Sequence, residues 1–175
     1  MPARHQTLTA TFDWNYDLLT EPERMLLRRL AVFAGGWTVQ AAEAICAGDV
    51  LAPQDVTDRL LSLVDKSWVV VTPAPAGHRY HYLDTVRQYA QQRLTAAGED
   101  EATRNKHLDY FVQWAEASAP YLFTPEQAEW LTQFDAEHDN IRAAVEWSQT
   151  RPDAADHGLR LAAACWKYWR IRGYF

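Results

Sequence analysis

The stretch PQDVTDRLLSLVDKSWVVVTPAPAGHRYHYL, residues 53–83, decides the fold of the first half of the chain. Its first part predicts a helix, because apolar residues recur three or four positions apart. These residues are Val56, Leu60, Leu63 and Val64. The β-branched run 68–71 then predicts a strand, 72–77 is rich in proline and glycine, and the alternation over 79–83 predicts a returning strand. We therefore expect a helix followed by a two-stranded hairpin.

Four helical segments surround this stretch. Residues 8–19 carry apolar side chains at helical spacing, and Thr20 with Glu23 forms a capping box that opens a second helix. A glycine pair separates that helix from a short one over 37–48. After the hairpin, Asp84 is placed to cap a further helix. Helices followed by a hairpin are the order typical of a winged-helix domain.

The acidic turn that follows Gly98 marks the predicted domain boundary. Beyond it the sequence predicts three helices of similar length with aromatic and aliphatic faces, which is typical of stacked helical repeats. The fold class expected is mainly α: a winged-helix domain with a small β-hairpin over 1–97, and a tetratricopeptide-like repeat region, truncated, over 98–175. In its second helix we expect His138 on the apolar face.

Composition limits the classes of partner. The chain has 48% hydrophobic residues and a net charge of −6. Residues 1–98 hold nine Lys and Arg against ten Asp and Glu, and 99–175 hold eight against thirteen, so neither half offers the clustered positive charge that binds nucleic acid. No apolar run is long enough to span a membrane, so we expect a soluble, cytoplasmic protein with no membrane partner. Cys46 and Cys165 are predicted to be buried thiols.

Several phrases resemble one protein family. They are RHQTL at 4–8, FDWNYDLL at 12–19, RLAVFAGGW at 29–37, LVDKS at 63–67, TVRQYA at 85–90 and AEHDNIRAA at 136–144. Together they resemble bacterial LuxR/AfsR-type transcriptional regulators built on a signal-transduction (STAND, NB-ARC-like) ATPase core. In that family a nucleotide-binding domain precedes a winged helix and tetratricopeptide-like repeats.

The resemblance implies a role in regulation. It implies a nucleotide-binding domain upstream, holding ADP or ATP, a winged helix that packs on that domain without reading DNA, and repeats that receive an inducer or a protein. No cofactor is expected in this fragment. Related eukaryotic members begin the helix after the wing with Met-His-Asp, whose histidine contacts phosphate, whereas this chain has Tyr82-Leu83-Asp84. The candidates for residues that face the nucleotide are Arg79, Asp84 and Arg87.

No catalytic or metal site is predicted. Gly35-Gly36 lacks the flanking pattern of a phosphate loop and predicts a structural turn. His78 and His81 have no further metal ligand nearby, and Asp13 and Asp17 lack the pocket and nucleophile that an active site needs. We therefore expect no enzymatic activity.

Binding surfaces are expected at the end of the chain. Trp166 and Trp169 lie on a predicted helix that has no later helix to cover it, together with Leu161 and Cys165. Because an open solenoid end exposes apolar surface, these tryptophans are candidate interaction residues and self-association is possible there.

Three functions remain open. The first is a non-catalytic regulatory and scaffold module of a signal-transduction ATPase regulator. The second is a DNA-binding winged-helix regulator with a helical dimerisation domain, in which the recognition helix 54–67 carries three aspartates against one arginine and one lysine. The third is a free-standing repeat protein that binds peptides.

Overall fold

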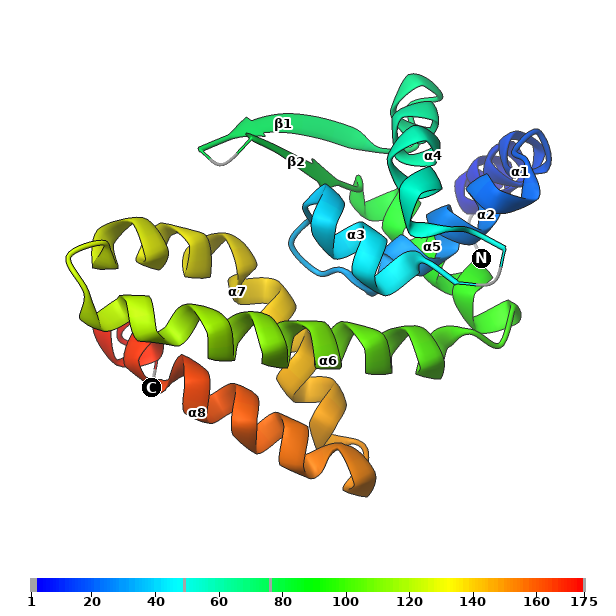
Figure 1. The fold of residues 1–175 in the computed structure, drawn as a ribbon. Helices are drawn as coiled ribbons and strands as arrows, with labels where there is room; N and C mark the ends of the chain where they lie inside the picture. Colours follow the sequence, from blue (N-terminus) through cyan, green and yellow to red (C-terminus); the bar gives the residue numbers. More distant parts are fainter. Residues whose placement is uncertain (1–2, 49, 76, 175) are drawn as a thin grey trace. The chain divides into compact units, whose positions relative to one another are not determined.

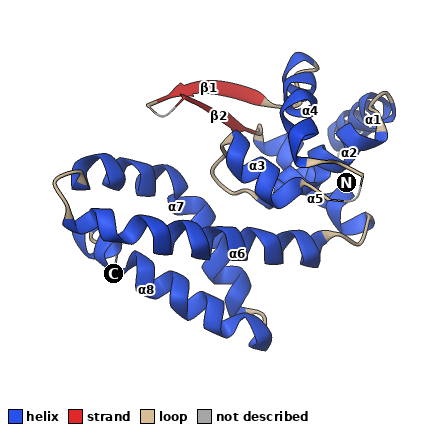
Figure 2. Ribbon diagram, in the orientation of Figure 1, coloured by secondary structure: helices blue, strands red, loops and turns tan. Residues whose placement is uncertain are grey.

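The computed structural model describes residues 3–48, 50–75 and 77–174, and it is mainly helical with one small sheet (Figures 1 and 2). The α-helices are α1 (Ala3–Asp17), α2 (Glu21–Arg29), α3 (Val39–Cys46), α4 (Pro53–Asp65), α5 (Asp84–Ala96), α6 (Asp100–Ser118), α7 (Gln127–Gln149) and α8 (Ala155–Arg172). Short 3₁₀ turns are η1 (Leu30–Val32), η2 (Ala119–Phe123) and η3 (Pro152–Ala154), and the strands are β1 (Val70–Ala74) and β2 (Gly77–His81).

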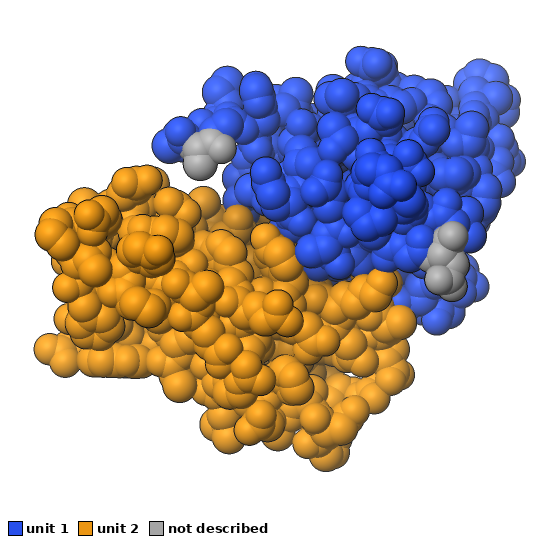
Figure 3. All heavy atoms as spheres, in the orientation of Figure 1, with its two compact units in different colours: residues 1–32, 38–100 blue, residues 33–37, 101–175 orange. Residues whose placement is uncertain are grey.

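The chain forms two compact units (Figure 3). The first holds 1–32 and 38–100, and the second holds 33–37 and 101–175. The predicted bounds, 1–97 and 98–175, differ from these units in where the division falls and in the five residues 33–37. These five residues pack with the helices of the second unit although the sequence places them between α2 and α3.

The first unit is a winged-helix domain around an apolar core. Helix α2 packs on α4 and α5, and α3 packs on α4. The core is fully buried at Leu26, Leu27, Leu30, Ile45, Val56, Leu60, Leu63, Ala90 and Leu94. The predicted apolar face of the helix before the hairpin is thus the face that enters the core, with Val64 half-buried at its edge.

The hairpin is antiparallel and its register runs from Val70 opposite His81 to Ala74 opposite Gly77. The predicted strands, 68–71 and 79–83, were therefore displaced. Residues 68 and 69 are buried before the strand begins, and pairing extends through Pro73 into the segment predicted as a loop. Pro73 is tolerated because a two-stranded sheet has only edge strands, where one side of the backbone needs no ladder hydrogen bond.

Of the caps predicted at Thr20 and Asp84, the first is confirmed, and Thr38 caps α3 although no cap was predicted there. The Glu23 carboxylate accepts a hydrogen bond from the Thr20 backbone N–H at 2.8 Å, and the Thr38 hydroxyl accepts one from Ala41 N–H at 3.2 Å. The prediction that Asp84 caps α5 was wrong, because Leu83 occupies the N-cap position and Asp84 is the first helical residue. There its carboxylate still interacts favourably with the positive end of the helix dipole.

The second unit consists of the segment 33–37 with α6, α7 and α8, an arrangement consistent with a helical repeat region. Trp114 of α6 meets Phe134 of α7 edge to face at 4.8 Å, and Phe134 stacks on Tyr168 of α8 at 5.1 Å. Helices α7 and α8 approach closely at Gly158, where an added Cβ would lie 2.1 Å from the Ser148 hydroxyl oxygen.

The buried face of α7 differs from the predicted one. Leu131, Phe134 and Ile141 are buried as expected, but His138 is half-buried, with its ring 4.3 Å from that of Tyr174. The other buried positions on α7 are Glu137, Asn140, Ala144 and Ser148. Polar side chains therefore occupy positions that a hydrophobic pattern assigns to solvent.

Candidate nucleic-acid interface

Helix α4 precedes the hairpin and thus stands where a winged-helix protein places its recognition helix. Its outward face exposes Asp55, Asp58 and Asp65 together with Gln54 and Leu61. Its arginine, Arg59, is only half-exposed. Because DNA binding depends on cations that neutralise phosphates, this face would repel a DNA backbone.

The lysine next to α4 is engaged inside the first unit. Lys66 Nζ lies 2.6 Å from Glu23 Oε1, which also accepts a hydrogen bond from the Ser62 hydroxyl at 2.6 Å. Burial raises the pKa of the Glu23 carboxyl, but hydrogen bonds from Lys66, Ser62 and Thr20 outweigh burial and lower the pKa to about 2. Glu23 therefore serves as a buried anchor between α2 and α4.

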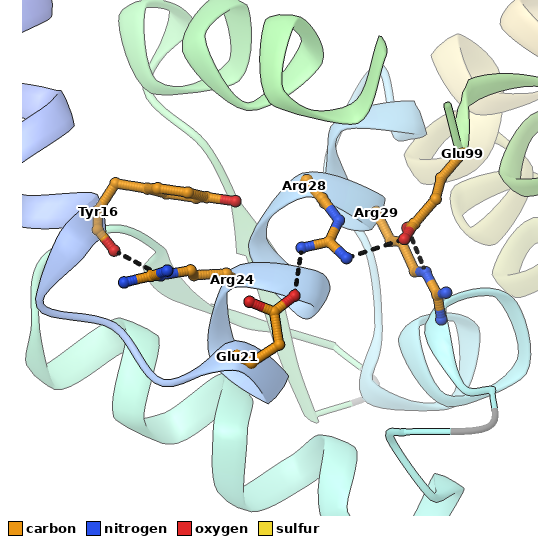
Figure 4. Close-up of polar contacts among 6 residues, drawn as sticks. All are labelled: Tyr16, Glu21, Arg24, Arg28, Arg29 and Glu99. Carbon is orange, nitrogen blue, oxygen red and sulfur yellow. Dashed lines mark hydrogen bonds and ion pairs between the residues drawn. The ribbon is translucent and has the colours of Figure 1, made fainter. Parts of the chain in front are cut away.

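Three arginines of α2 form a second cluster, shown in Figure 4. Arg24 donates to the backbone carbonyls of Tyr16 at 3.0 Å and Asp17 at 2.7 Å, and so caps the C-terminal end of α1. Arg28 and Arg29 each donate to the Glu99 carboxylate at 2.8 Å. This cluster ties α2 to the segment that follows α5.

Further contacts complete this cluster. Arg28 also donates to Glu21 at 3.1 Å, and Arg29 donates to the Cys46 carbonyl at 2.9 Å. Burial raises the pKa of Glu99, but the hydrogen bonds from Arg28 and Arg29 outweigh burial, so the pKa lies below its usual range. The guanidinium groups are thereby used for internal contacts, and they hold the fold together.

Most of the Lys and Arg side chains of the first unit form ion pairs or hydrogen bonds inside that unit. Arg93 pairs with Asp13 and also donates to the Tyr89 hydroxyl at 2.9 Å. The basic side chains with an ion pair or hydrogen bond inside the unit are Arg24, Arg28, Arg29, Lys66 and Arg93. The described part of the unit thus shows no cluster of exposed cations on the helix that a DNA reader would use.

The predicted nucleotide-facing residues lie on two elements. Arg79 is half-buried on β2, Asp84 is exposed at the start of α5, and Arg87 is half-buried one turn later. Arg87 Nε is buried and has no hydrogen-bond partner within the described ranges. His78 is exposed and His81 half-buried on the hairpin.

The described residues form neither a cluster of metal ligands nor a membrane-spanning helix. Within residues 3–48, 50–75 and 77–174 no group of three or more His, Cys, Asp or Glu side chains could hold a metal ion. None of the described helices is both long and apolar enough to cross a bilayer. Cys46 and Cys165 are buried thiols.

A third polar cluster lies in the second unit and is centred on Asn140 of α7. Its side-chain oxygen accepts a hydrogen bond from Ala34 N–H, and its Nδ2 donates to the Gly36 carbonyl, both at 2.8 Å. Nδ2 also donates to Glu137 at 2.7 Å. We call this arrangement the Asn140 clamp, because one amide fixes both sides of the turn at Gly35.

Aromatic rings surround the clamp. Phe33 and Trp37 are almost fully buried, and their rings stack with centroids 5.4 Å apart. The His107 ring meets that of Phe33 edge to face, with centroids 5.5 Å apart. Burial lowers the pKa of His107 to about 3. Gly36 has φ 97°, a left-handed conformation that favours glycine. The glycine pair predicted as a structural turn therefore does form one, and it is held by α7.

The predicted interaction residues on α8 are separated by the fold. Trp166 is 46% exposed and Trp169 is half-buried. Leu161 and Cys165, expected on the same open face, are fully buried. The expectation of one continuous open apolar face was wrong, because those two residues lie on the side of α8 that enters the core of the unit.

Sequence patterns missed the residues that organise these clusters. Glu23 was predicted only as half of a capping box, while Glu99 was assigned to a turn and Asn140 had no assigned role. The only signal was indirect, since the phrases 29–37 and 136–144 both carried the family resemblance, and the structure brings these two phrases together at the Asn140 clamp.

Comparison with known proteins agrees with the winged-helix assignment. Residues 19–95 match the family model of winged helix-turn-helix domains. The chain is 40% identical over 174 residues, 98% of its length, to proteins of Mycobacterium bovis and Mycobacterium tuberculosis that carry the name "Putative HTH-type transcriptional regulator". It is also 41% identical over 109 residues, 62% of its length and 28% of the relative's, to an uncharacterized protein of M. tuberculosis. No solved structure matches the chain.

These findings establish a winged-helix domain and homology to proteins named as transcriptional regulators. They favour the second hypothesis, a DNA-binding regulator, over the ATPase scaffold, and they do not support the expectation that nucleic acid is excluded as a partner. Neither an ATPase core nor tetratricopeptide repeats receive support from them. The chain spans 19% of the length of these regulators.

Proposed function

We propose that this chain is a non-catalytic module of a transcriptional regulator, in which the winged helix contacts protein and the second unit binds a partner or inducer. The names of the relatives support the regulatory role. The observation that carries the choice of protein over DNA is the outward face of α4, which exposes Asp55, Asp58 and Asp65. An acidic face suits contact with a basic protein surface.

The protein partner proposed for the winged helix is a nucleotide-binding domain of the same polypeptide or complex, as the family resemblance implies. The relatives leave room for such a domain, because this chain matches 19% of their length. ADP or ATP would then bind to that domain, and the module itself needs no cofactor. Calorimetry of residues 1–175 with ATP and with ADP should show no heat of binding, and micromolar binding would contradict this part of the proposal.

The experiment that tests the choice is a titration of fluorescent duplex DNA with the chain at 50 and 150 mM salt. We expect weak binding that is insensitive to Arg59→Ala and is lost at the higher salt, because the recognition-helix face is acidic. Replacing Asp55 and Asp58 with asparagine should strengthen this nonspecific binding. Sequence-specific binding that persists at 150 mM salt would overturn the choice of protein over DNA.

The second candidate is a DNA-binding winged-helix regulator with a helical dimerisation domain. The match of residues 19–95 to winged helix-turn-helix domains and the names of the relatives favour it. In that case the hairpin would supply the phosphate contact, since Arg79 lies on β2. Arg79→Ala would then weaken binding uniformly across sequences and reduce the dependence on salt, as loss of one phosphate contact does.

A further inference from the structure

A groove on the second unit lies between η2 and α8. It has a volume of about 410 Å³ and is lined by Ala119, Pro120, Phe123, Ala163 and Ala164, with Glu116 and Arg160. Alanine and proline side chains are short, so a docking segment can approach the backbone of α8 closely. The groove is therefore shaped to take apolar side chains, and no side chain of the described residues fills it.

Large apolar side chains stand exposed beside this groove. Phe123 is 63% exposed, Leu159 71% and Trp166 46%, and the Phe123 and Trp166 rings are 6.4 Å apart. Leu159, Ala163 and Trp166 follow one another at spacings of four and three residues and so share one face of α8. Exposed apolar surface gathered around a hollow is typical of a binding site.

Two cations lie over the aromatic rings at the edge of the groove. Lys167 Nζ lies 4.9 Å from the centre of the Phe123 ring, and the Arg170 guanidinium lies 5.8 Å from that of Trp166. Neither cation forms an ion pair within the described ranges. Arg160, in contrast, is neutralised by Glu116 through two hydrogen bonds of 2.8 Å. Two uncompensated cations thus flank an apolar groove in a region, 99–175, that is acidic as a whole.

We infer that this groove binds an amphipathic helix of a protein partner, whose apolar side chains enter the groove and whose flanking carboxylates meet Lys167 and Arg170. A helix laid into an apolar groove presents side chains at i, i+3, i+4 and i+7, which matches the spacing of the α8 face. The carboxylates pair with cations that already lie over aromatic rings. This inference names the chemistry of the partner that the proposed function assigns to the second unit, and it rests on that assignment.

A second copy of this chain fits the groove less well. In a twofold-symmetric dimer the same patch meets itself, so Lys167 and Arg170 would face the same two cations of the other copy. Repulsion between like charges in a desolvated contact disfavours that pairing. The acidic helix is therefore the occupant that the charges select.

The experiment is calorimetric titration of residues 1–175 with two synthetic 18-residue helical peptides. Both carry leucine at i, i+4, i+7 and i+11, and the flanking positions are glutamate in one and lysine in the other. We expect the glutamate peptide to bind at least tenfold more tightly than the lysine peptide, and Lys167→Glu/Arg170→Glu to reverse that preference. Trp166→Ala should weaken the glutamate peptide at least fivefold.

Arg142→Glu serves as the matched control, because it reverses one exposed charge on α7 outside the groove, and it should leave both affinities unchanged. Equal affinity for the two peptides, or binding of neither at millimolar concentration, would overturn the inference. So would a concentration-dependent dimer, seen by light scattering, that Lys167→Glu/Arg170→Glu leaves intact and Trp166→Glu abolishes. The DNA titration above concerns the first unit alone, so its outcome separates failure of the proposed function from failure of this inference.

Discussion

Each unit contains a polar cluster that stabilises its own fold, and the two clusters differ in charge and burial. In the first, the charged side chains of Arg28 and Arg29 converge on Glu99, which keeps 22% of its side chain exposed. In the second, the neutral amide of Asn140 is fully buried and bonds to the backbone of the turn at Gly35. A charged cluster near solvent is screened by salt, whereas a buried amide is not. Loss of the buried Asn140 amide leaves backbone groups unpaired. Removing it should therefore lower the free energy of unfolding more than removing the charge of Glu99.

The largest effect is expected for Asn140→Ala. The change removes both bonds to the turn and leaves the Ala34 N–H and the Gly36 carbonyl without their partner. Each buried group left unpaired costs about 1–3 kcal/mol, so the free energy of unfolding should fall by about 3 kcal/mol. Urea denaturation followed by circular dichroism measures the loss. A change below about 1 kcal/mol would show that the clamp contributes little to stability.

The pH dependence of stability should be the next largest effect. His107 has its pKa lowered to about 3 in the folded chain, below the ordinary value near 6.5. Its contribution is therefore complete above pH 6.5 and is lost as the pH falls from 6.5 towards 3, by about 1.4 kcal/mol per unit. Urea denaturation between pH 7 and 5 measures this slope. His107→Phe should flatten it, and an unchanged slope in that variant would refute the assignment to His107.

A smaller effect is expected for Glu99→Gln in the first unit. The amide keeps one acceptor but loses the charge that faces Arg28 and Arg29, so the free energy of unfolding should fall by about 1 kcal/mol at low salt. The loss should shrink in 1 M sodium chloride, because salt already screens the wild-type pair. Asn140→Ala should lose the same amount at both salt concentrations. A salt-independent loss for Glu99→Gln would remove the contrast between the two clusters.

The smallest effect is expected for Glu146→Gln. Glu146 pairs with Arg142 one turn earlier on α7 at 3.3 Å, and both side chains are more than half exposed. Such pairs contribute about 0.3 kcal/mol, so the thermal midpoint should be unchanged within error. This variant is the baseline for the other three, and a loss above about 1 kcal/mol would mean that exposed charge contributes more to α7 than its geometry indicates.

Much of the fold could be predicted because local signals agreed with one another. The spacing of Val56, Leu60 and Leu63 predicted α4, and the capping box of Thr20 and Glu23 predicted where α2 begins. The hairpin bounds were displaced because β-branched residues indicate strand propensity but not register. The candidate sites could be predicted only in part, since α4 and its acidic charges were identified while the ion pairs that hold Lys66, Arg28 and Arg29 inside the first unit were not.

The sequence by itself determined the winged-helix order, the mainly helical second half and the acidic character of the helix before the hairpin, because periodicity, capping and charge are local properties. Only the tertiary structure decided that Glu99 bridges two arginines about seventy positions away and that Asn140 holds the turn 33–37, more than a hundred positions earlier. It also decided that Leu161 and Cys165 are buried while Trp166 is exposed beside a groove. These features depend on which surfaces meet when the helices pack, and no pattern of neighbouring residues encodes that.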